Sequence, residues 1–339
     1  MGKDSQEAKL RVQADKDLFK ATVPFGVESV KTSWWLVGST FTMLIASLFG
    51  AALAPAWPIR LVFSILSALL MVRAFITYHD YMHNAILSRS RIARWLFRLY
   101  AAFSLTPPRS WKRSHNYHHG HVGNIAADSA GAFPIMTTDM WRNASLAKRI
   151  GYRVERHPLT ILTGYFTIFF LTVTLLPLLR NPARHWDSLL VLLGHGTLIA
   201  ALWVFGGFDV AFFVVLLPMT IASMLGSYLF FAQHSFENMR VLPIETWTSR
   251  RAAMETSSYM KLNKVMRWFA GNIGYHHIHH LNVRIPFYRL PEAMEAIPEL
   301  QSPVTTTLSL ADIRACFRCC LWDEGLQQMV SYREFARSP

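Results

Sequence analysis

The chain has 339 residues, of which 52% are apolar and 16% are charged, whereas a soluble globular protein carries about 25% charged residues. Its formal net charge is +13, but the basic residues flank apolar runs and form no stripe with interleaved aromatic side chains, which argues against a nucleic-acid partner. Basic segments beside apolar runs are typical of the cytoplasmic side of membrane proteins. The composition therefore predicts an integral membrane protein.

Two apolar runs near the N-terminus predict a helical hairpin. Trp34–Trp57 is long enough to cross a bilayer, which takes about 20 residues. Pro55 interrupts this run, and the second run, Ile59–Tyr78, follows at once. The hairpin would bring His79 and His83 to the same side of the membrane as the N-terminus.

The segment after this hairpin is strongly basic. By the positive-inside rule its basic residues place this side of the membrane in the cytoplasm. Ile92–Leu105 alternates arginine with aromatic and aliphatic residues, which predicts an amphipathic helix on the membrane surface. We expect Arg73, two turns before His79, to extend toward the lipid headgroups. The basic residues of the segment are Arg89, Arg91, Arg94, Arg98, Arg109, Lys112 and Arg113.

Three further apolar runs follow a mixed, polar stretch over residues 120–158, for which we predict a soluble cap. The runs are Leu159–Leu179, Asp187–Phe205 and Phe208–Ala232. An even number of crossings is needed to return the later histidines to the side of the earlier ones. Because Leu159–Leu179 has basic residues at both ends, we predict that it lies in the interface or re-enters. The last two runs would form a hairpin through Gly206 and Gly207, and which of the three runs fails to cross is the open point.

The predicted fold class is therefore all-α, a polytopic membrane helical bundle. It would have about four full transmembrane crossings, one interfacial or re-entrant segment, and a cytoplasmic histidine-rich cap that holds a dimetal site. We divide the chain into a soluble N-terminal segment (1–30), a membrane domain (31–300) and a soluble C-terminal tail (301–339), with both termini on the cytoplasmic side. The three cysteines lie in the tail without a second pair, which predicts packing or surface thiols: Cys316, Cys319 and Cys320.

Histidines are the most distinctive feature of the sequence, because ten of the fourteen lie in three short clusters. Positions i, i+3 and i+4 of a helix share one face, and two of the clusters have this spacing. Neutral imidazole is the commonest protein ligand for iron, copper and zinc. The clusters therefore predict one metal site. They comprise His79 and His83; His115, His118, His119 and His121; and His276, His277, His279 and His280.

The type of site follows from the ligands and the membrane setting. The zinc-protease pattern HExxH and the Glu-x-x-His pair of soluble di-iron bundles are both absent from the sequence. Eight or nine imidazoles are too many for one tetrahedral zinc ion and suit two ions. A membrane setting points to an apolar substrate, whose unactivated C–H bonds need an oxidant that zinc cannot generate. These residues predict an O₂-dependent di-iron oxidase that acts on a lipid.

The clusters also resemble those of a known family. HDYMH (79–83), HNYHH (115–119) and HHIHH (276–280) look like the three histidine boxes of the integral-membrane fatty acid desaturases. The stretch GNIGYHHIHHLNVRIPFYRLPEAM (271–294) is similar to the acyl-lipid Δ12 (omega-6) branch, and FFAQHSFEN (230–238) resembles the additional histidine segment of that branch. The resemblance runs from about Leu61 to Leu300. Tyr81-Met82 in the first box and GHVGNIAADSAGAF after the second depart from the pattern of the branch.

The resemblance implies an enzyme that uses O₂ and two electrons, from ferredoxin or cytochrome b5, to place a cis double bond in an acyl chain. The substrate would be an acyl-lipid or an acyl-thioester. The candidates for neighbours that orient the ligands are Asp80, Glu237 and His277. The implied catalytic and metal-ligating residues for two iron ions are His79, His83, His115, His118, His119, His234, His276, His279 and His280.

Two other functions fit parts of the pattern. A membrane di-iron hydroxylase or ketolase acting on a carotenoid, alkane or sphingolipid would share the first C–H abstraction. A metal-handling transporter would need histidines within the crossings, where His195 is the one deeply placed candidate, and we expect that side chain to be packed and neutral. The sequence leaves open the double-bond position, the acyl carrier, the electron donor and the oligomeric state.

Overall fold

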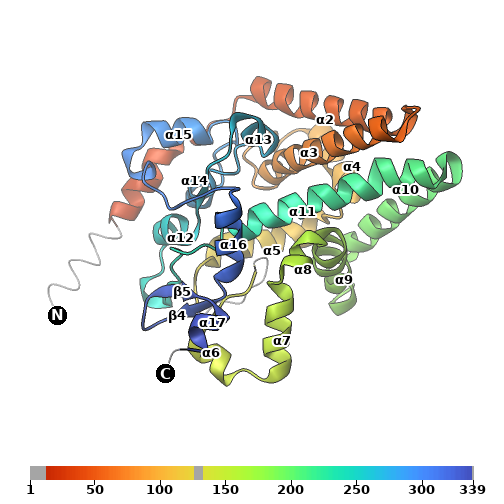
Figure 1. Ribbon diagram of the computed structural model, residues 1–339. Helices are drawn as coiled ribbons and strands as arrows, with labels where there is room; N and C mark the ends of the chain where they lie inside the picture. Colours follow the sequence, from red (N-terminus) through yellow and green to blue (C-terminus); the bar gives the residue numbers. More distant parts are fainter. Residues whose placement is uncertain (1–12, 126–132, 338–339) are drawn as a thin grey trace.

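The computed structural model describes residues 13–125 and 133–337, and these are mostly helical. Four long helices project to one side, to the right in Figure 1, and shorter elements are grouped at their other ends, which we call the cap. The long helices are α2 (Val30–Leu53), α3 (Trp57–Met82), α10 (Trp186–Ala211) and α11 (Leu217–Ala232).

The shorter elements lie along the rest of the chain. Before the third apolar run they are η1 (Val23–Gly26), α4 (Arg91–Phe103), α5 (Pro108–His121), α6 (Thr138–Asn143) and α7 (Leu146–Glu155). That run comprises α8 (Pro158–Leu162), the π-helix η2 (Tyr165–Leu175) and α9 (Leu176–Arg180), and a second π-helical stretch, η3 (Phe212–Leu216), joins α10 to α11. The later elements are η4 (Ile244–Thr246), α12 (Ser249–Thr256), α13 (Lys264–Phe269), α14 (His276–Leu281), α15 (Leu290–Ala296), η5 (Pro298–Leu300), α16 (Leu310–Arg318) and α17 (Tyr332–Phe335).

The predicted first hairpin is confirmed. Helix α2 ends at Leu53 and α3 begins at Trp57, with Pro58 in the first turn of α3, where a proline is tolerated because that N–H has no partner in a helix. The two helices pack closely, because a Cβ atom at Gly50 would lie 2.7 Å from the ring of Phe63. The Ser47 hydroxyl also donates to the Phe63 carbonyl at 2.9 Å. Small residues therefore set the spacing of this pair, as is common between membrane helices.

A second hairpin follows from a break inside a very long apolar run. Among the described residues, three helical stretches are long and apolar enough to cross a membrane: Val30–Leu53, Trp57–Met82 and Trp186–Ala232. The third has 47 residues, more than twice the ~20 that one crossing needs. Gly207 interrupts it with φ 83° and ψ 168°, a conformation open mainly to glycine. Figure 1 shows α10 running outward and α11 returning, as the two glycines predicted.

The remaining apolar run is shorter and less regular. Its helical part, Tyr165–Arg180, is shorter than the three candidate spans. The Tyr165 hydroxyl lies 2.6 Å from Nε2 of His195, and Nδ1 of His195 lies 3.0 Å from the Phe103 carbonyl. His195 is thus buried and paired on both nitrogens, as expected for a packed residue. The prediction that this run does not cross the membrane stays a prediction.

The cap contains two small sheets that tie the C-terminal residues to the middle of the chain. Strand β4 (Leu321–Asp323) pairs in parallel with β1 (Met136–Thr137) and antiparallel with β5 (Gln328–Val330). Strand β3 (Thr305–Thr306) pairs in parallel with β2 (Tyr259–Met260). The three cysteines are buried and free, as expected for packing thiols.

The N-terminal residues also pack on the cap. Asn282 donates from Nδ2 to the Thr22 hydroxyl at 2.9 Å, and Arg289 donates to the carbonyls of Pro24 and Val27. Both ends of the described chain therefore lie on the side opposite the tips of the long helices (Figure 1). The division of the chain at residues 30 and 300 stays a prediction.

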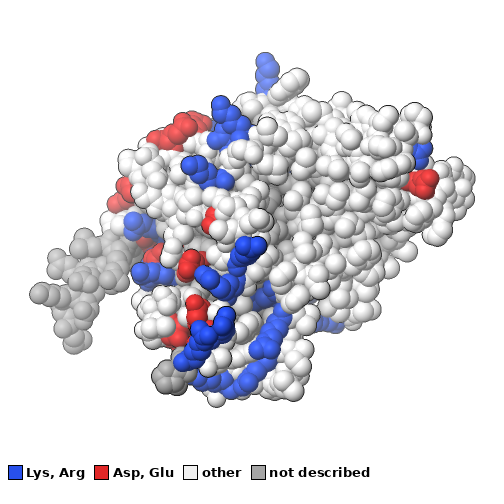
Figure 2. All heavy atoms as spheres, in the orientation of Figure 1, with Lys and Arg blue, Asp and Glu red and all other residues white. Residues whose placement is uncertain are grey.

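Charged side chains distinguish the cap from the long helices. Figure 2 shows Lys, Arg, Asp and Glu gathered over the cap, whereas the visible surface of the long helices is almost free of them. The amphipathic helix predicted after the first hairpin is present as α4. Its residues Ile92, Trp95 and Leu99 are 72%, 63% and 70% exposed, whereas Phe97 and Tyr100 are buried. An apolar face on both sides of this helix suits a position between the bundle and lipid.

Arg73 differs from its expected position. We predicted that it extends toward the headgroups, but it is only 4% exposed and lies inside the protein. Its guanidinium lies 4.1 Å from the ring centroid of Trp268 and donates to the Trp268 carbonyl, while its Nε donates to the Thr40 hydroxyl at 3.1 Å. Trp268 from α13 covers Arg73, so the cation is satisfied within the fold and joins α2, α3 and α13.

Candidate metal centre

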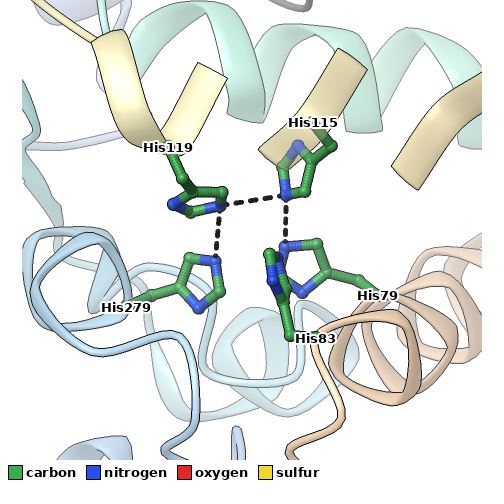
Figure 3. A group of neighbouring side chains, drawn as sticks. All are labelled: His79, His83, His115, His119 and His279. Carbon is green, nitrogen blue, oxygen red and sulfur yellow. Dashed lines mark hydrogen bonds between the residues drawn. The ribbon is translucent and has the colours of Figure 1, made fainter. Parts of the chain in front are cut away.

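The structure brings nine histidines into two adjacent groups. Within each group, one ring nitrogen from each histidine lies within 4.8 Å of the corresponding nitrogens of the others, and no described carboxylate or thiol joins them. Figure 3 shows the rings of the first group converging from different parts of the chain. The first group is His79, His83, His115, His119 and His279, and the second group is His118, His234, His276 and His280.

Two short helices contribute to both groups and so set the spacing between them. On α5, His115 and His119 face the first group and His118 faces the second. On α14, the histidine of the first group is His279, while His276 and His280 belong to the second. The end of α3 supplies the other two rings of the first group, and the residue after the α11 C-cap supplies the last ring of the second. The helices predicted from the spacing of the second and third clusters are present as α5 and α14.

The Nε2 atoms of the histidines point at one another. In the first group, Nε2 of His115 lies 2.9 Å from Nε2 of His79 and 3.1 Å from that of His119. In the second group, Nε2 of His276 lies 2.8 Å from that of His234 and 3.1 Å from that of His280. A neutral imidazole has one N–H and one lone pair. Clustered Nε2 atoms therefore bring several lone pairs to the middle of each group.

Several ring nitrogens in the described structure have no hydrogen-bond partner although they are buried. These are Nε2 of His83 and Nδ1 of His118, His119, His276, His277, His279 and His280. Leaving a buried polar atom without a partner costs about 1–3 kcal/mol, so burying these rings lowers the stability of the fold. A metal ion in each group would bind the converging Nε2 atoms, which otherwise face one another at 2.8 to 3.2 Å, so the residues present fit two nitrogen-bound ions.

Burial keeps these rings neutral. Desolvation, and secondarily the neighbouring histidines, lowers the pKa of His115, His119 and His279 well below 6.5. Burial likewise lowers the pKa of His234 to about 4. A neutral ring has a free lone pair at pH 7, which is the form that binds a metal.

The orientation of two rings is fixed by partners on their other nitrogen. Nδ1 of His234 donates to the Thr256 carbonyl at 3.0 Å, which leaves Nε2 free to face the group. Gly123, at φ +72°, packs against Thr256 so closely that a Cβ atom would overlap it. In the first group, Nδ1 of His79 lies 3.1 Å from Oδ1 of Asp80, and Oδ2 of Asp80 accepts the Phe287 backbone N–H at 2.6 Å.

The three predicted neighbours have different positions. Asp80 lies beside His79, as the orienting role requires. His277 points away from the groups, because its Nε2 lies 3.2 Å from the Leu300 carbonyl. Glu237 is on the surface, where its 64% exposed side chain lies 3.6 Å from Arg318, so the structure does not place it with the histidines. Glu237 was predicted to approach the site because it follows His234 by three residues, which is one helical turn. Helix α11 ends at Ala232, however, and the chain beyond it is not helical.

Two features of the site were not predicted from the sequence. Trp111 stacks on His115 with ring centroids 4.3 Å apart and planes 21° apart. Its position one helical turn before that histidine was a signal that could have been used. Thr256 could not have been found, because it acts through its backbone carbonyl, which every residue has.

Comparisons with known proteins identify the family. A model of the fatty acid desaturase family matches residues 55–307. The chain belongs to the fatty acid desaturase family. A fatty acid desaturase of Bacillus subtilis (strain 168) is 30% identical over 328 residues, which cover 96% of this chain and 92% of the relative.

More distant relatives of this desaturase carry more specific names. An sn-1 acyl-lipid omega-3 desaturase (ferredoxin) of Nostoc sp. (strain 36) is 25% identical, with 73% of this chain and 69% of the relative covered. An sn-1 oleoyl-lipid 12-desaturase of Synechocystis sp. (strain ATCC 27184 / PCC 6803 / Kazusa) is 24% identical, with 68% of this chain and 66% of the relative covered. The protein is therefore an oxidoreductase of the membrane, a fatty acid desaturase with two histidine groups that can each hold a metal ion.

Proposed function

We propose that this desaturase is a di-iron enzyme whose two histidine groups are the two iron sites. The observation that carries the proposal is the convergence of nine imidazoles, eight of them buried and that of His119 partly buried, in two groups without a carboxylate or thiol among the described residues. Nitrogen ligands with open coordination positions favour iron over zinc in oxygen chemistry. His79, His83, His115, His119 and His279 would hold one ion, and His118, His234, His276 and His280 the other.

The proposed reaction removes two hydrogen atoms from neighbouring methylenes of an acyl chain and leaves a cis double bond. O₂, two electrons and two protons are consumed together with these two hydrogens, and two water molecules form. When bound, the two irons supply the redox chemistry that breaks the unactivated C–H bonds. The chain itself excludes water from the site, keeps the imidazoles neutral, and positions the methylenes, which are otherwise chemically alike.

For regiospecificity we propose a Δ12 (omega-6)-like reaction. The stretch from Gly271 to Met294 supports it through its likeness to that branch, and one relative is named as an oleoyl-lipid 12-desaturase. The substrate would be an acyl-lipid or an acyl-thioester. The electron donor would be an external protein such as ferredoxin or cytochrome b5, and the name of one relative specifies ferredoxin.

The proposed topology has four crossings, formed by α2, α3, α10 and α11, with the segment Tyr165–Arg180 lying in the interface or re-entering. The active site and both termini would be cytoplasmic. The apolar lengths of these helices and the break at Gly207 support four crossings. The gathering of Lys and Arg on the cap supports the cytoplasmic side (Figure 2).

A small apolar cavity lies where an acyl chain could approach the site. It has a volume of about 30 Å³ and lies among α3, α11 and α13, the helices that lead into the histidines at 79, 234 and 276. Ten residues line it: Leu69, Val72, Leu225, Tyr228, Leu229, Leu262, Met266, Phe269, Ala270 and Leu308. We propose that it is part of the acyl-chain path.

The fatty acid profile of a host that expresses the protein tests the function. Gas chromatography with derivatives that locate double bonds should show a new unsaturated acid, and the His279→Ala variant should show none while it remains in the membrane. A new diene with its second bond at Δ12 supports the full proposal. A hydroxylated product would contradict desaturation, and full activity of His279→Ala would contradict the metal site.

A further inference from the structure

Helix α7 has an exposed apolar ridge on an otherwise polar part of the chain. Leu146, Ile150 and Val154 are 73%, 52% and 56% exposed. They occupy positions i, i+4 and i+8, so their side chains form one line along the helix. Three large aliphatic side chains in a row form an exposed apolar patch, and such patches often mark protein or membrane contacts.

Helix α7 is attached to the cap through Tyr152, its one buried residue, which lies on the face opposite the ridge. Tyr152 is buried, and its hydroxyl accepts the Met136 backbone N–H at 3.1 Å and donates to the Cys320 carbonyl. Arg153 lies over the rings of Trp141 and Tyr332. These contacts join α7 to the sheet of β1, β4 and β5 and fix which side of the helix faces outward.

The position of α7 indicates what the ridge meets. Figure 1 shows α7 at the boundary between the cap and the long helices, with its axis running across theirs. If the long helices cross the bilayer, α7 lies parallel to its plane. The ridge also continues into the next helix, α8, where Leu159 and Leu162 are 62% and 45% exposed, and from there into the apolar π-helix η2.

The charges on α7 are consistent with contact between this helix and lipid. Helix α7 carries three basic residues, Lys148, Arg149 and Arg153, and one acidic residue, Glu155. Basic residues on a helix with an apolar ridge are the pattern of helices that lie in a membrane interface. Two of these cations, Arg149 and Arg153, also lie over aromatic rings of the cap. A protein partner would also cover an apolar ridge, but continuity with the apolar α8–η2 segment favours lipid.

We infer that α7 is a monotopic membrane helix, with its ridge of Leu146, Ile150 and Val154 seated in the headgroup–acyl boundary of the phospholipid bilayer. This inference revises the soluble cap expected over residues 120–158, and it rests on the proposed crossings but not on the metal chemistry. The position of α7 in the membrane interface would affect the histidine site. Arg156, directly after α7, donates to the hydroxyl of Ser235 at 3.0 Å, next to His234, so the bilayer would support one wall of the second histidine group.

Spin labels at single positions test the inference in the full-length protein in phosphatidylcholine–phosphatidylglycerol nanodiscs. Ile150→Cys and Val154→Cys place the label on the ridge. Leu326→Cys is the matched control, because Leu326 is a leucine of similar exposure, 63%, and follows β4 on the side of the cap away from the long helices (Figure 1). The native cysteines are buried, and unmodified protein treated in parallel gives the background.

The measurement compares collisions of the label with O₂, which is concentrated in lipid, and with a water-soluble nickel chelate. We expect O₂ collisions to exceed nickel collisions at 150 and 154, and the reverse at 326. Nickel collisions that dominate at both ridge positions would overturn the inference. Low collision rates with both reagents there would also overturn it, because they would mean that protein covers the ridge. Leu146→Cys provides a third reading if either variant fails to fold.

Discussion

The carboxylate of Asp187 accepts the backbone N–H of Arg109 at 2.7 Å, although the two residues are 78 positions apart. Asp187 lies in the first turn of α10, and Arg109 lies in the first turn of α5, which carries three of the nine histidines. Helix α5 has no side-chain cap of its own, since its N-cap residue is Pro107. Asp187 also accepts from the backbone and hydroxyl of Ser110. It therefore caps a histidine-bearing helix from a distant helix.

Replacing this carboxylate should weaken the site. Asp187→Ala should cost about 0.5–2 kcal/mol of stability, as expected for a lost helix cap, and should reduce the metal content and activity. Asp187→Asn keeps an acceptor and should restore most of both. Ser309→Ala removes the cap of α16, a helix without histidines, and serves as the control. Equal metal loss in Asp187→Ala and Ser309→Ala would show that the effect is general destabilisation.

Asp80 should tune metal binding through His79. Because its two oxygens contact His79 and the Phe287 backbone N–H, Asp80→Asn would disturb the hydrogen bond that orients the ring. Loss of such a partner typically lowers metal affinity by about 10–100-fold. Metal titration of the metal-free protein measures this affinity. An unchanged affinity would show that Asp80 acts only in packing.

Two histidines of α14, His280 and His277, should differ in their effect on the iron content. His280→Ala removes one nitrogen of the four-histidine group and should lower the iron content from about two toward one per chain, with loss of activity. His277→Gln keeps a donor near the Leu300 carbonyl and should retain both irons. Iron per chain, measured by mass spectrometry, distinguishes the variants. Equal iron loss in both would contradict the assignment of His277 as a residue outside the site.

Acid should destabilise the metal-free protein. Burial lowers the pKa of His234 to about 4 and that of His277 to about 4, from 6.5. The folded state therefore binds fewer protons than the unfolded state between pH 4 and pH 6.5. The stability from these two residues is complete above pH 6.5 and is lost as the pH falls toward 4, at up to about 1.4 kcal/mol per pH unit for each residue.

Thermal unfolding of the metal-free protein in detergent, from pH 7.5 to pH 5, measures this dependence. The midpoint should be flat above pH 6.5 and should fall below it. His277→Gln removes one of the two contributions and should make the fall shallower. A midpoint that rises on acidification would contradict the sign of both pKa shifts.

The cavity among α3, α11 and α13 should control chain length. Leu225→Trp adds a large ring to its wall, and in the proposed acyl path this should reduce desaturation of long chains more than of short ones. Leu193→Trp is the control, because Leu193 is 58% exposed on α10 and does not line the cavity. Product distributions from hosts fed acids of different lengths give the comparison. An unchanged length preference would show that the acyl chain does not pass this cavity.

Local sequence patterns were sufficient for the elements and for much of the site. Apolar runs of about 20 residues, the break at Pro55 and the glycines at 206 and 207 predicted both hairpins, because helix length and glycine conformation are local properties. The i, i+3 and i+4 spacing likewise predicted which histidines share a helix face. His277 was predicted as a neighbour that orients the ligands, but in the structure its Nε2 faces the Leu300 carbonyl instead.

Only the tertiary structure decided how the clusters divide. The sequence does not reveal that α5 and α14 each serve both groups, because this depends on how two helices far apart in the chain pack. Arg73 shows the same limit: a cation near a membrane helix end usually extends to the headgroups, but Trp268, 195 residues away, covers it here. The Asp187 cap on α5 and the Thr256 carbonyl behind His234 are also contacts between distant segments. Spacing along one helix determined the histidine faces, whereas packing between helices decided which faces meet.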